Sequence, residues 1–144
     1  MIAQGHLRRI AAWSQELDVR ESEVARTGIV ERSYGAEERI FMRGDRFDYW
    51  AGVVSGLARM GVVSRGGKQA SFASLTAGAW FGEGSVLKNE ARLHDVVALR
   101  DTRLALMDRT TFVWLFENSV AFNRFLVPRP AKPRLNIRER IMAG

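Results

Sequence analysis

Short runs of strand-forming residues alternate with turns from Ile29 to Asp108, and this alternation constrains the fold more than any other feature of the sequence. Glycines separate the runs at intervals of roughly ten residues, a spacing that favours an antiparallel sandwich or barrel over βαβ units. These glycines stand at positions 35, 44, 56, 66, 67, 78 and 82. The pair Gly66-Gly67 predicts a hairpin turn, and Asp101-Thr102 separates two final strands over residues 95–100 and 103–108.

Helical periodicity replaces this alternation at both ends of the chain. Residues 6–17 predict an amphipathic helix, and a second, shorter helix is expected over residues 20–27. After the strands, Asp108 or Thr110 can cap a third helix, and residues 121–127 start a fourth. The large apolar residues of these last two helices are Phe112, Leu115, Phe116, Val120, Phe122, Phe125 and Leu126.

These patterns predict an α+β fold, namely a double-stranded, antiparallel, jelly-roll-like β-roll flanked by N-terminal and C-terminal helices. Residues 1–127 are expected to form this single domain, since the chain is long enough for one core but too short for two. Ten apolar residues are expected to be buried in it: Phe41, Val53, Val54, Val62, Phe72, Leu75, Phe81, Val97, Leu104 and Leu106. Trp50 and Trp80 are expected to pack in the core or at its rim.

Composition excludes several classes of function. The chain has no cysteine, which rules out disulfides, thiolate nucleophiles, iron–sulfur clusters and cysteine-ligated zinc. Its two histidines, His6 and His94, are far apart in sequence, so neither a metal site nor a Ser-His-Asp triad is indicated, and we expect no enzyme. No apolar run reaches the roughly 18 residues that span a bilayer. We therefore expect a cytoplasmic protein with no membrane partner.

The basic charge of the chain is concentrated near its C-terminus. From Val127 onward, five basic residues stand against one acid, and the rest of the chain carries only +2 of the total net charge of +6. Three prolines disfavour helix in the same stretch. Residues 128–144 are therefore predicted to form a disordered, basic, proline-rich tail, and a solvated tail is favoured over an arm that contacts DNA.

An ordered set of short motifs resembles the cyclic-nucleotide-binding domain of the Crp–Fnr family of bacterial transcription regulators. The first strands carry Ile40-Phe41, Gly44-Asp45, Asp48 and the run from Val53 to Gly56. Phe81-Gly82-Glu83 then resembles the start of the family's phosphate-binding cassette, and Arg92 its far end. The resemblance extends over roughly residues 5–127 and implies the β-roll fold reached above from the strand pattern.

The resemblance also implies a ligand and the residues that bind it. In the family, the residue matching Gly82 lies in a tight turn, the Glu accepts hydrogen bonds from a ribose hydroxyl, and the Arg binds the cyclic phosphate with its fork of donors. A cyclic nucleotide such as cyclic AMP, or another small anionic effector, is therefore the implied ligand; no cofactor is certain. The candidate ligand-binding residues are Gly82, Glu83, Gly84, Ser85, Arg92, Leu93 and His94.

Three of these residues depart from the family pattern. After the Arg, nucleotide-binding members usually carry a Ser, Thr or Ala and then an Ala, whereas this chain has Leu93 and His94. Leu93 donates no hydrogen bond, His94 is bulkier than Ala, and Gly84 stands where a branched apolar residue is common. We therefore expect a folded but altered cassette, with Glu83 and Arg92 facing one cavity and a weakened grip on cyclic AMP. Two alternatives stay open: Glu83 and Arg92 form a structural ion pair, and His94 is a rim or core histidine.

The family resemblance implies a regulatory role. Crp–Fnr regulators continue from the β-roll into a long dimerisation helix and a helix-turn-helix that reads DNA. Residues 128–144 are too few for a helix-turn-helix, so DNA would be bound only through a domain missing from this chain. We expect the ligand-sensing domain of such a regulator, forming a homodimer through its C-terminal helices. The alternative is a ligand-free β-roll that serves as a dimerisation or protein-interaction module.

Overall fold

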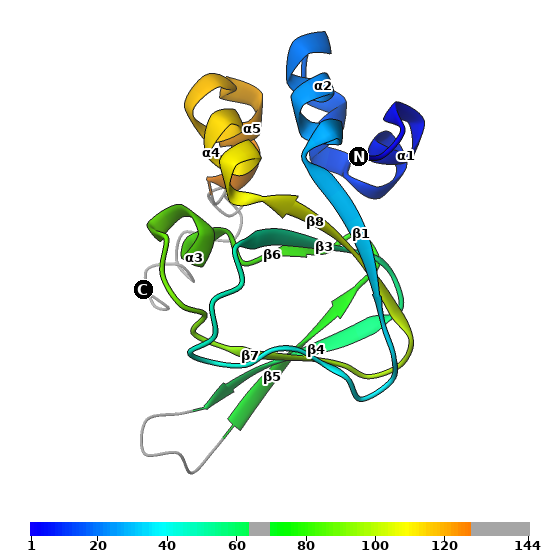
Figure 1. Ribbon diagram of the computed structural model, residues 1–144, viewed down its shortest axis with the longest axis vertical. Helices are drawn as coiled ribbons and strands as arrows, with labels where there is room; N and C mark the ends of the chain where they lie inside the picture. Colours follow the sequence, from blue (N-terminus) through cyan, green and yellow to red (C-terminus); the bar gives the residue numbers. More distant parts are fainter. Residues whose placement is uncertain (64–69, 128–144) are drawn as a thin grey trace, which may run out of the picture.

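In residues 1–63 and 70–127, which the computed structural model describes, two four-stranded antiparallel sheets face each other (Figure 1). The strands are β1 (Ile29–Tyr34), β2 (Arg39–Phe41), β3 (Tyr49–Ser55), β4 (Leu57–Val63), β5 (Ala70–Thr76), β6 (Trp80–Phe81), β7 (Asp95–Ala98) and β8 (Thr102–Asp108). The helices are α1 (Gln4–Ile10), the 3-10 helix η1 (Ala12–Glu16), α2 (Val19–Thr27), α3 (Glu83–Lys88), α4 (Arg109–Asn118) and α5 (Val120–Leu126). The Gly66-Gly67 turn and the 128–144 tail lie outside the described residues.

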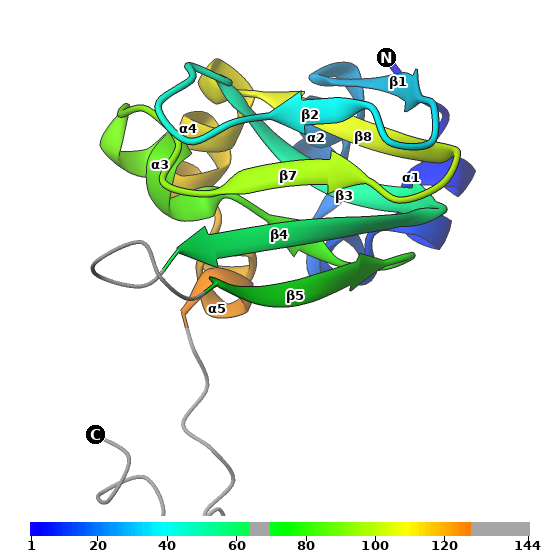
Figure 2. The same cartoon turned by 90° about the horizontal axis from the view of Figure 1, so that it is seen from below.

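Consecutive strands lie in different sheets, except for the hairpin of β4 and β5, which belongs to one sheet. One sheet has the order β1-β8-β3-β6 and the other β2-β7-β4-β5. Figure 2 shows the second sheet across the front, with the helices on the far side of the roll. The predicted α+β fold, an antiparallel β-roll with flanking helices, is confirmed.

The central strands β3 and β8 of the first sheet are buried on both faces because the helices cover its outer side. Along β8, Leu104 and Leu106 point into the roll, whereas Ala105 and Met107 pack against the helices. All four side chains are fully buried. A strand buried on both faces carries a continuous apolar run rather than an alternating one, which is the pattern of residues 104–107.

An aromatic cluster joins the helices to this sheet. Trp50 of β3 lies 5.2 Å from Trp13 of η1 and 5.4 Å from Phe112 of α4 and from Phe122 of α5, measured between ring centroids. Trp80 of β6 lies 4.6 Å from Trp50 and covers Gly52, where a Cβ atom would approach the Trp80 ring to 2.2 Å. The expectation that Trp50 and Trp80 pack in the core or at its rim is confirmed, and the cluster fixes η1, α4 and α5 on the outer face of the first sheet.

The single helix predicted over residues 6–17 is wrong. Helix α1 ends at Ile10, and Ala11 is extended, with φ −133° and ψ 98°. The hydroxyl of Ser14 then donates to the Ala11 carbonyl at 2.7 Å, a local bond that competes with helix formation. Because the helix is broken here, the Trp13 side chain points toward Trp50 and packs in the aromatic cluster. The other helices agree better with the sequence: Asp108 caps α4 by accepting from the Thr111 amide at 2.8 Å.

The predicted core residues Phe72 and Val97 lie outside the core. Phe72 of β5 is 57% exposed and Val97 of β7 is only half-buried. Both lie on the outer face of the second sheet, where Arg59 stands opposite Val97 and packs its guanidinium 4.5 Å from the Phe72 ring. Val96, one residue earlier, is fully buried within the roll.

The remaining core residues follow the prediction more closely. Phe41, Val53, Leu75, Phe81, Leu104 and Leu106 are buried. Val54 is half-buried and packs on the helix side of the first sheet, beside a register shift in β3. The side chain of Val62 lies outside the described residues.

Replacing Val96 by alanine should lower the free energy of unfolding by about 2 kcal/mol, because it removes buried methyl groups and leaves a cavity. The matched change Val97→Ala removes the same atoms from a half-exposed position and should cost less than about 1 kcal/mol. Denaturant unfolding of the two variants measures both values. Equal losses of unfolding free energy in the two variants would contradict the assignment of Val96 to the inner face of β7 and Val97 to its outer face.

Candidate functional site

The segment between β6 and β7 forms a turn, the short helix α3 and a return loop. Gly82 connects β6 to α3 with φ 93°, in the left-handed region that favours glycine. A Cβ atom at Gly82 would also lie 2.0 Å from Nη1 of Arg92. Both the backbone conformation and this close approach therefore require glycine at position 82.

The loop between β2 and β3 holds the far end of the segment. The Gly44 amide donates to the Arg92 carbonyl at 2.8 Å, and the Arg92 amide donates to the Asp45 carbonyl at 2.9 Å. The Asp45 carboxylate accepts from the Met42 amide at 2.9 Å and so closes the turn of this loop. The Gly-Asp motif found in the sequence thus positions Arg92.

Arg46 is a site-forming residue that the sequence analysis missed. Its guanidinium donates to the carbonyl of Asn89 at 3.0 Å and to the side-chain oxygen of Asn89 at 2.7 Å. Asn89 ends α3 in the left-handed region, with φ 56°. Arg46 therefore fixes the end of α3 to the β2–β3 loop. An arginine in a turn carries no sequence signal for this contact.

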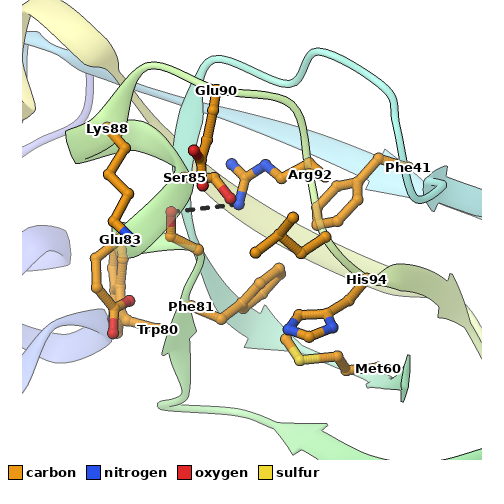
Figure 3. Close-up of a pocket in the computed structure, with 13 residues that line it drawn as sticks. Phe41, Met60, Trp80, Phe81, Glu83, Ser85, Lys88, Glu90, Arg92 and His94 are labelled. Carbon is orange, nitrogen blue, oxygen red and sulfur yellow. Dashed lines mark hydrogen bonds between the residues drawn. The ribbon is translucent and has the colours of Figure 1, made fainter. Parts of the chain in front are cut away.

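Arg92 is buried, with 3% of its surface exposed, and its guanidinium binds backbone carbonyls of the chain itself. Nε and Nη2 donate to the Phe47 carbonyl at 3.2 and 2.8 Å, and Nη2 also donates to the Tyr49 carbonyl. Nη1 donates to the Gly82 carbonyl at 3.3 Å, the bond drawn dashed in Figure 3. These bonds use four of the five N–H donors of a guanidinium.

Aromatic rings and nearby carboxylates complete the surroundings of Arg92. Its guanidinium carbon lies 4.6 Å from the ring centroid of Phe41 and 5.2 Å from that of Phe47, within cation–π range. Burial lowers the pKa of Arg92 to about 10, while the charges of Asp48 and Glu83 oppose this shift. Arg92 therefore remains a cation at neutral pH.

Glu83 does not pair with Arg92. Its Oε1 accepts a hydrogen bond from the Trp50 indole at 3.2 Å, and Figure 3 shows its side chain beside Trp80, away from Arg92. Among the residues that the structure describes, the ion pairs do not include one between Glu83 and Arg92. The alternative of a structural ion pair is therefore wrong, although Glu83 still acts on Arg92 through its charge.

A pocket of about 300 Å³ brings the candidate residues together. All seven predicted site residues line it. Leu93 is 59% exposed there, and a Cβ atom at Gly84 would meet nothing within 4 Å. His94 is half-buried, and its Nδ1 is buried with no hydrogen-bond partner among the described residues. Met60 and Lys88 also line the pocket and were missed, because no local pattern distinguishes them from ordinary strand and surface residues.

The pocket is lined by charged, polar and apolar side chains. In residues 1–63 and 70–127, no cluster of three or more His, Asp or Glu side chains is placed to hold a metal ion. Within the same residues, no helix has the length and hydropathy to cross a bilayer.

Comparisons with known proteins give one family and one fold. Residues 31–119 match the family model of the cyclic nucleotide-binding domain. The catabolite activator protein of Thermus thermophilus is 27% identical, with a TM-score of 0.69 over 91% of this chain and 59% of that one. This chain thus spans less than two thirds of that relative. No match was found among the curated proteins.

Two further solved structures share the fold at lower identity. The N-terminal domain of a transcriptional regulator from Streptomyces coelicolor A3(2) is 22% identical, with a TM-score of 0.64 over 83% of this chain and 87% of that one. The regulatory domain of Toxoplasma gondii PKA with cAMP is 19% identical, with a TM-score of 0.73 over 85% of this chain and 46% of that one.

Arg92→Met should lower the free energy of unfolding by at least about 2 kcal/mol, because three carbonyls lose a charged donor inside the protein. Arg46→Met is the matched control: its contacts lie at the surface, where the loss should stay below about 1 kcal/mol. Urea unfolding followed by tryptophan fluorescence measures both. If Arg92→Met lowers the free energy of unfolding no more than Arg46→Met does, the guanidinium does not stabilise the segment between β6 and β7.

Proposed function

Because the chain belongs to the cyclic nucleotide-binding domain family, we propose that it is the ligand-sensing regulatory domain of a Crp–Fnr-type transcription regulator. The observation that carries this proposal is the pocket, since all seven candidate residues line one cavity of about 300 Å³. A volume near 300 Å³ is at the lower end of small-molecule sites. The T. thermophilus activator and the S. coelicolor regulator domain support the regulatory part of the proposal.

The cassette keeps the outline of a cyclic-nucleotide site but has a weaker grip on a cyclic phosphate. A buried phosphate charge needs several donors at once, and each unmet partner costs about 1–3 kcal/mol. Most N–H donors of Arg92 already bond backbone carbonyls of this chain. Leu93 stands where nucleotide-binding members of the family usually carry a small residue, often with a hydroxyl. Cyclic AMP binding should therefore be weakened by about 30- to 150-fold, corresponding to roughly 2–3 kcal/mol.

A direct contact connects the pocket to the C-terminal helices. Arg109 at the start of α4 donates from Nε to the Val86 carbonyl of α3 at 2.9 Å. Val86 is buried in the same core as Phe112 and Phe122. A ligand that shifts α3 would thereby bias the position of α4 and α5, which is the route by which occupancy reaches the rest of the regulator.

The C-terminal helices supply the proposed homodimer contact. Three apolar side chains of α4 and α5 are fully buried in the core, namely Phe112, Leu115 and Phe122. By contrast, Phe125 is 45% exposed and Val120 is 67% exposed. These two side chains of α5 remain available to a partner chain, and we place the dimer contact on them. We place DNA recognition in a part of the regulator beyond this domain, and the whole protein in the cytoplasm.

A second function remains a candidate: a ligand-free β-roll that acts as an interaction module. The observation that favours it is Arg92, whose donors are satisfied by the chain itself. Binding measurements separate the two functions, because only the sensing domain has a small-molecule ligand.

Isothermal calorimetry with cyclic AMP near neutral pH tests the altered cassette. The unmodified chain should bind with a Kd above about 10 μM, and Leu93→Ser combined with His94→Ala should gain at least about tenfold in affinity. Adding Arg92→Lys, which keeps a charge but not the fork of donors, should remove that gain. Binding by the unmodified chain at low micromolar concentration would contradict the role given to Leu93.

Sedimentation equilibrium tests the dimer contact. Phe125→Ser should weaken self-association by about tenfold or more if this ring is buried between two chains. Phe72→Ser is the matched control, because Phe72 is an exposed ring on the opposite sheet. A monomer at tens of micromolar for the unmodified chain, or equal effects of both variants, would overturn this contact.

A further inference from the structure

The C-terminal end of α3 is held to the rest of the protein by few contacts. Residues 87–89 are exposed, whereas Val86 before them is buried. Among the described residues, the hydrogen bonds that join residues 87–91 to the chain outside α3 come from Arg46. A segment with little burial and few hydrogen bonds opens readily, so its position depends on the contacts that remain.

The guanidinium of Arg46 connects this end of α3 to the loop between β2 and β3. Nη1 donates to the Asn89 carbonyl at 3.0 Å, and Nη2 donates to the Asn89 side-chain oxygen at 2.7 Å. Nη2 also bonds Oδ1 of Asp48 at 2.8 Å, an ion pair within the same loop. Because a planar guanidinium presents its donors in a fixed fork, the bond to Asp48 orients the donors that reach Asn89.

Asn89 is the residue at which the chain turns out of α3 into the return loop. It lies in the left-handed region, with φ 56° and ψ 51°, and its amide donates to the Val86 carbonyl at 3.2 Å. The Glu90 amide donates to the Ser85 carbonyl at 3.1 Å and closes the helix end. Arg46 therefore bonds both oxygens of the residue that sets the direction of the return loop.

The two neighbours of Asn89 in the sequence are charged residues of the pocket. Lys88 and Glu90 both line it, and Figure 3 shows their side chains extending from the C-terminal end of α3. We propose that Arg46 is a positioning residue of the pocket, which holds Asn89 and so fixes the places of the Lys88 and Glu90 charges at the pocket rim. The role of this contact in ligand binding rests on the proposed sensing function.

Amide hydrogen exchange of the ligand-free protein, followed by ¹⁵N NMR, tests whether Arg46 holds the end of α3. Arg46→Met should speed exchange of the Asn89 and Glu90 amides by about three- to fivefold, a small factor because the contact is exposed. Arg43→Met is the matched control, because Arg43 belongs to the same loop and bonds Asp95 through its backbone amide. Equal exchange in the two variants would overturn the inference.

A double-mutant cycle tests whether Arg46 acts through Asn89. Asn89→Gly keeps a residue that adopts the left-handed region but removes the side-chain acceptor. In this background Arg46→Met should speed exchange of the Glu90 amide by at most about twofold, because the bond to the backbone carbonyl is then the one that is lost. An undiminished effect of Arg46→Met would show that the Asn89 side chain has no part in this contact.

Calorimetry with cyclic AMP relates the contact to the pocket. Arg46→Met should weaken binding by about threefold or more, because the ligand must then order the rim that Arg46 holds in the unmodified chain. Arg43→Met should leave the affinity unchanged, and an unchanged affinity in Arg46→Met would overturn the role of Arg46 in the pocket. Failure of the unmodified chain to bind cyclic AMP at millimolar concentration would overturn the proposed function, whereas faster exchange at Glu90 would still confirm that Arg46 positions this rim.

Discussion

The buried guanidinium of Arg92 is the interaction on which the site depends. It bonds the carbonyls of Phe47, Tyr49 and Gly82, and so joins the loop before β3, the start of β3 and the turn before α3. A charged group inside a protein is stable only when it is paired or richly hydrogen-bonded, and here the partners are backbone carbonyls. Four of the five N–H donors of the residue that shapes the pocket are thereby occupied before any anion binds.

The burial of β3 and β8 on both faces brings the pocket wall and the C-terminal helices into contact with the same strand. Its inner face forms the core of the roll and its outer face carries Trp50, which packs on α4 and α5 and also donates to Glu83. One tryptophan therefore contacts both the pocket wall and the C-terminal helices. Under the proposed sensing function, a change at Glu83 on ligand binding would reach the helices through this packed aromatic cluster.

Most of the fold was predictable because strand spacing and glycine turns are local signals, whereas several details depend on contacts distant in sequence. The helix break at Ala11 arises from Ser14 and from the packing of Trp13, neither of which periodicity reveals. Val97 was expected inside because runs of apolar residues do not identify which one faces the core. Motif spacing identified seven candidate residues that line one pocket, but the partners of Arg92 are main-chain atoms that no side-chain pattern encodes.

Hydrogen exchange at the Arg92 Nε–H, followed by ¹⁵N NMR with and without saturating cyclic AMP, tests the central claim most directly. If the guanidinium is committed to the carbonyls of Phe47, Tyr49 and Gly82, this proton is strongly protected in the ligand-free protein and its exchange rate does not change with cyclic AMP. The exposed Arg124 serves as the unprotected reference within the same spectrum. An Arg92 Nε–H that exchanges as fast as that of Arg124 until cyclic AMP is added would contradict the account, because its donors would then be reserved for the phosphate.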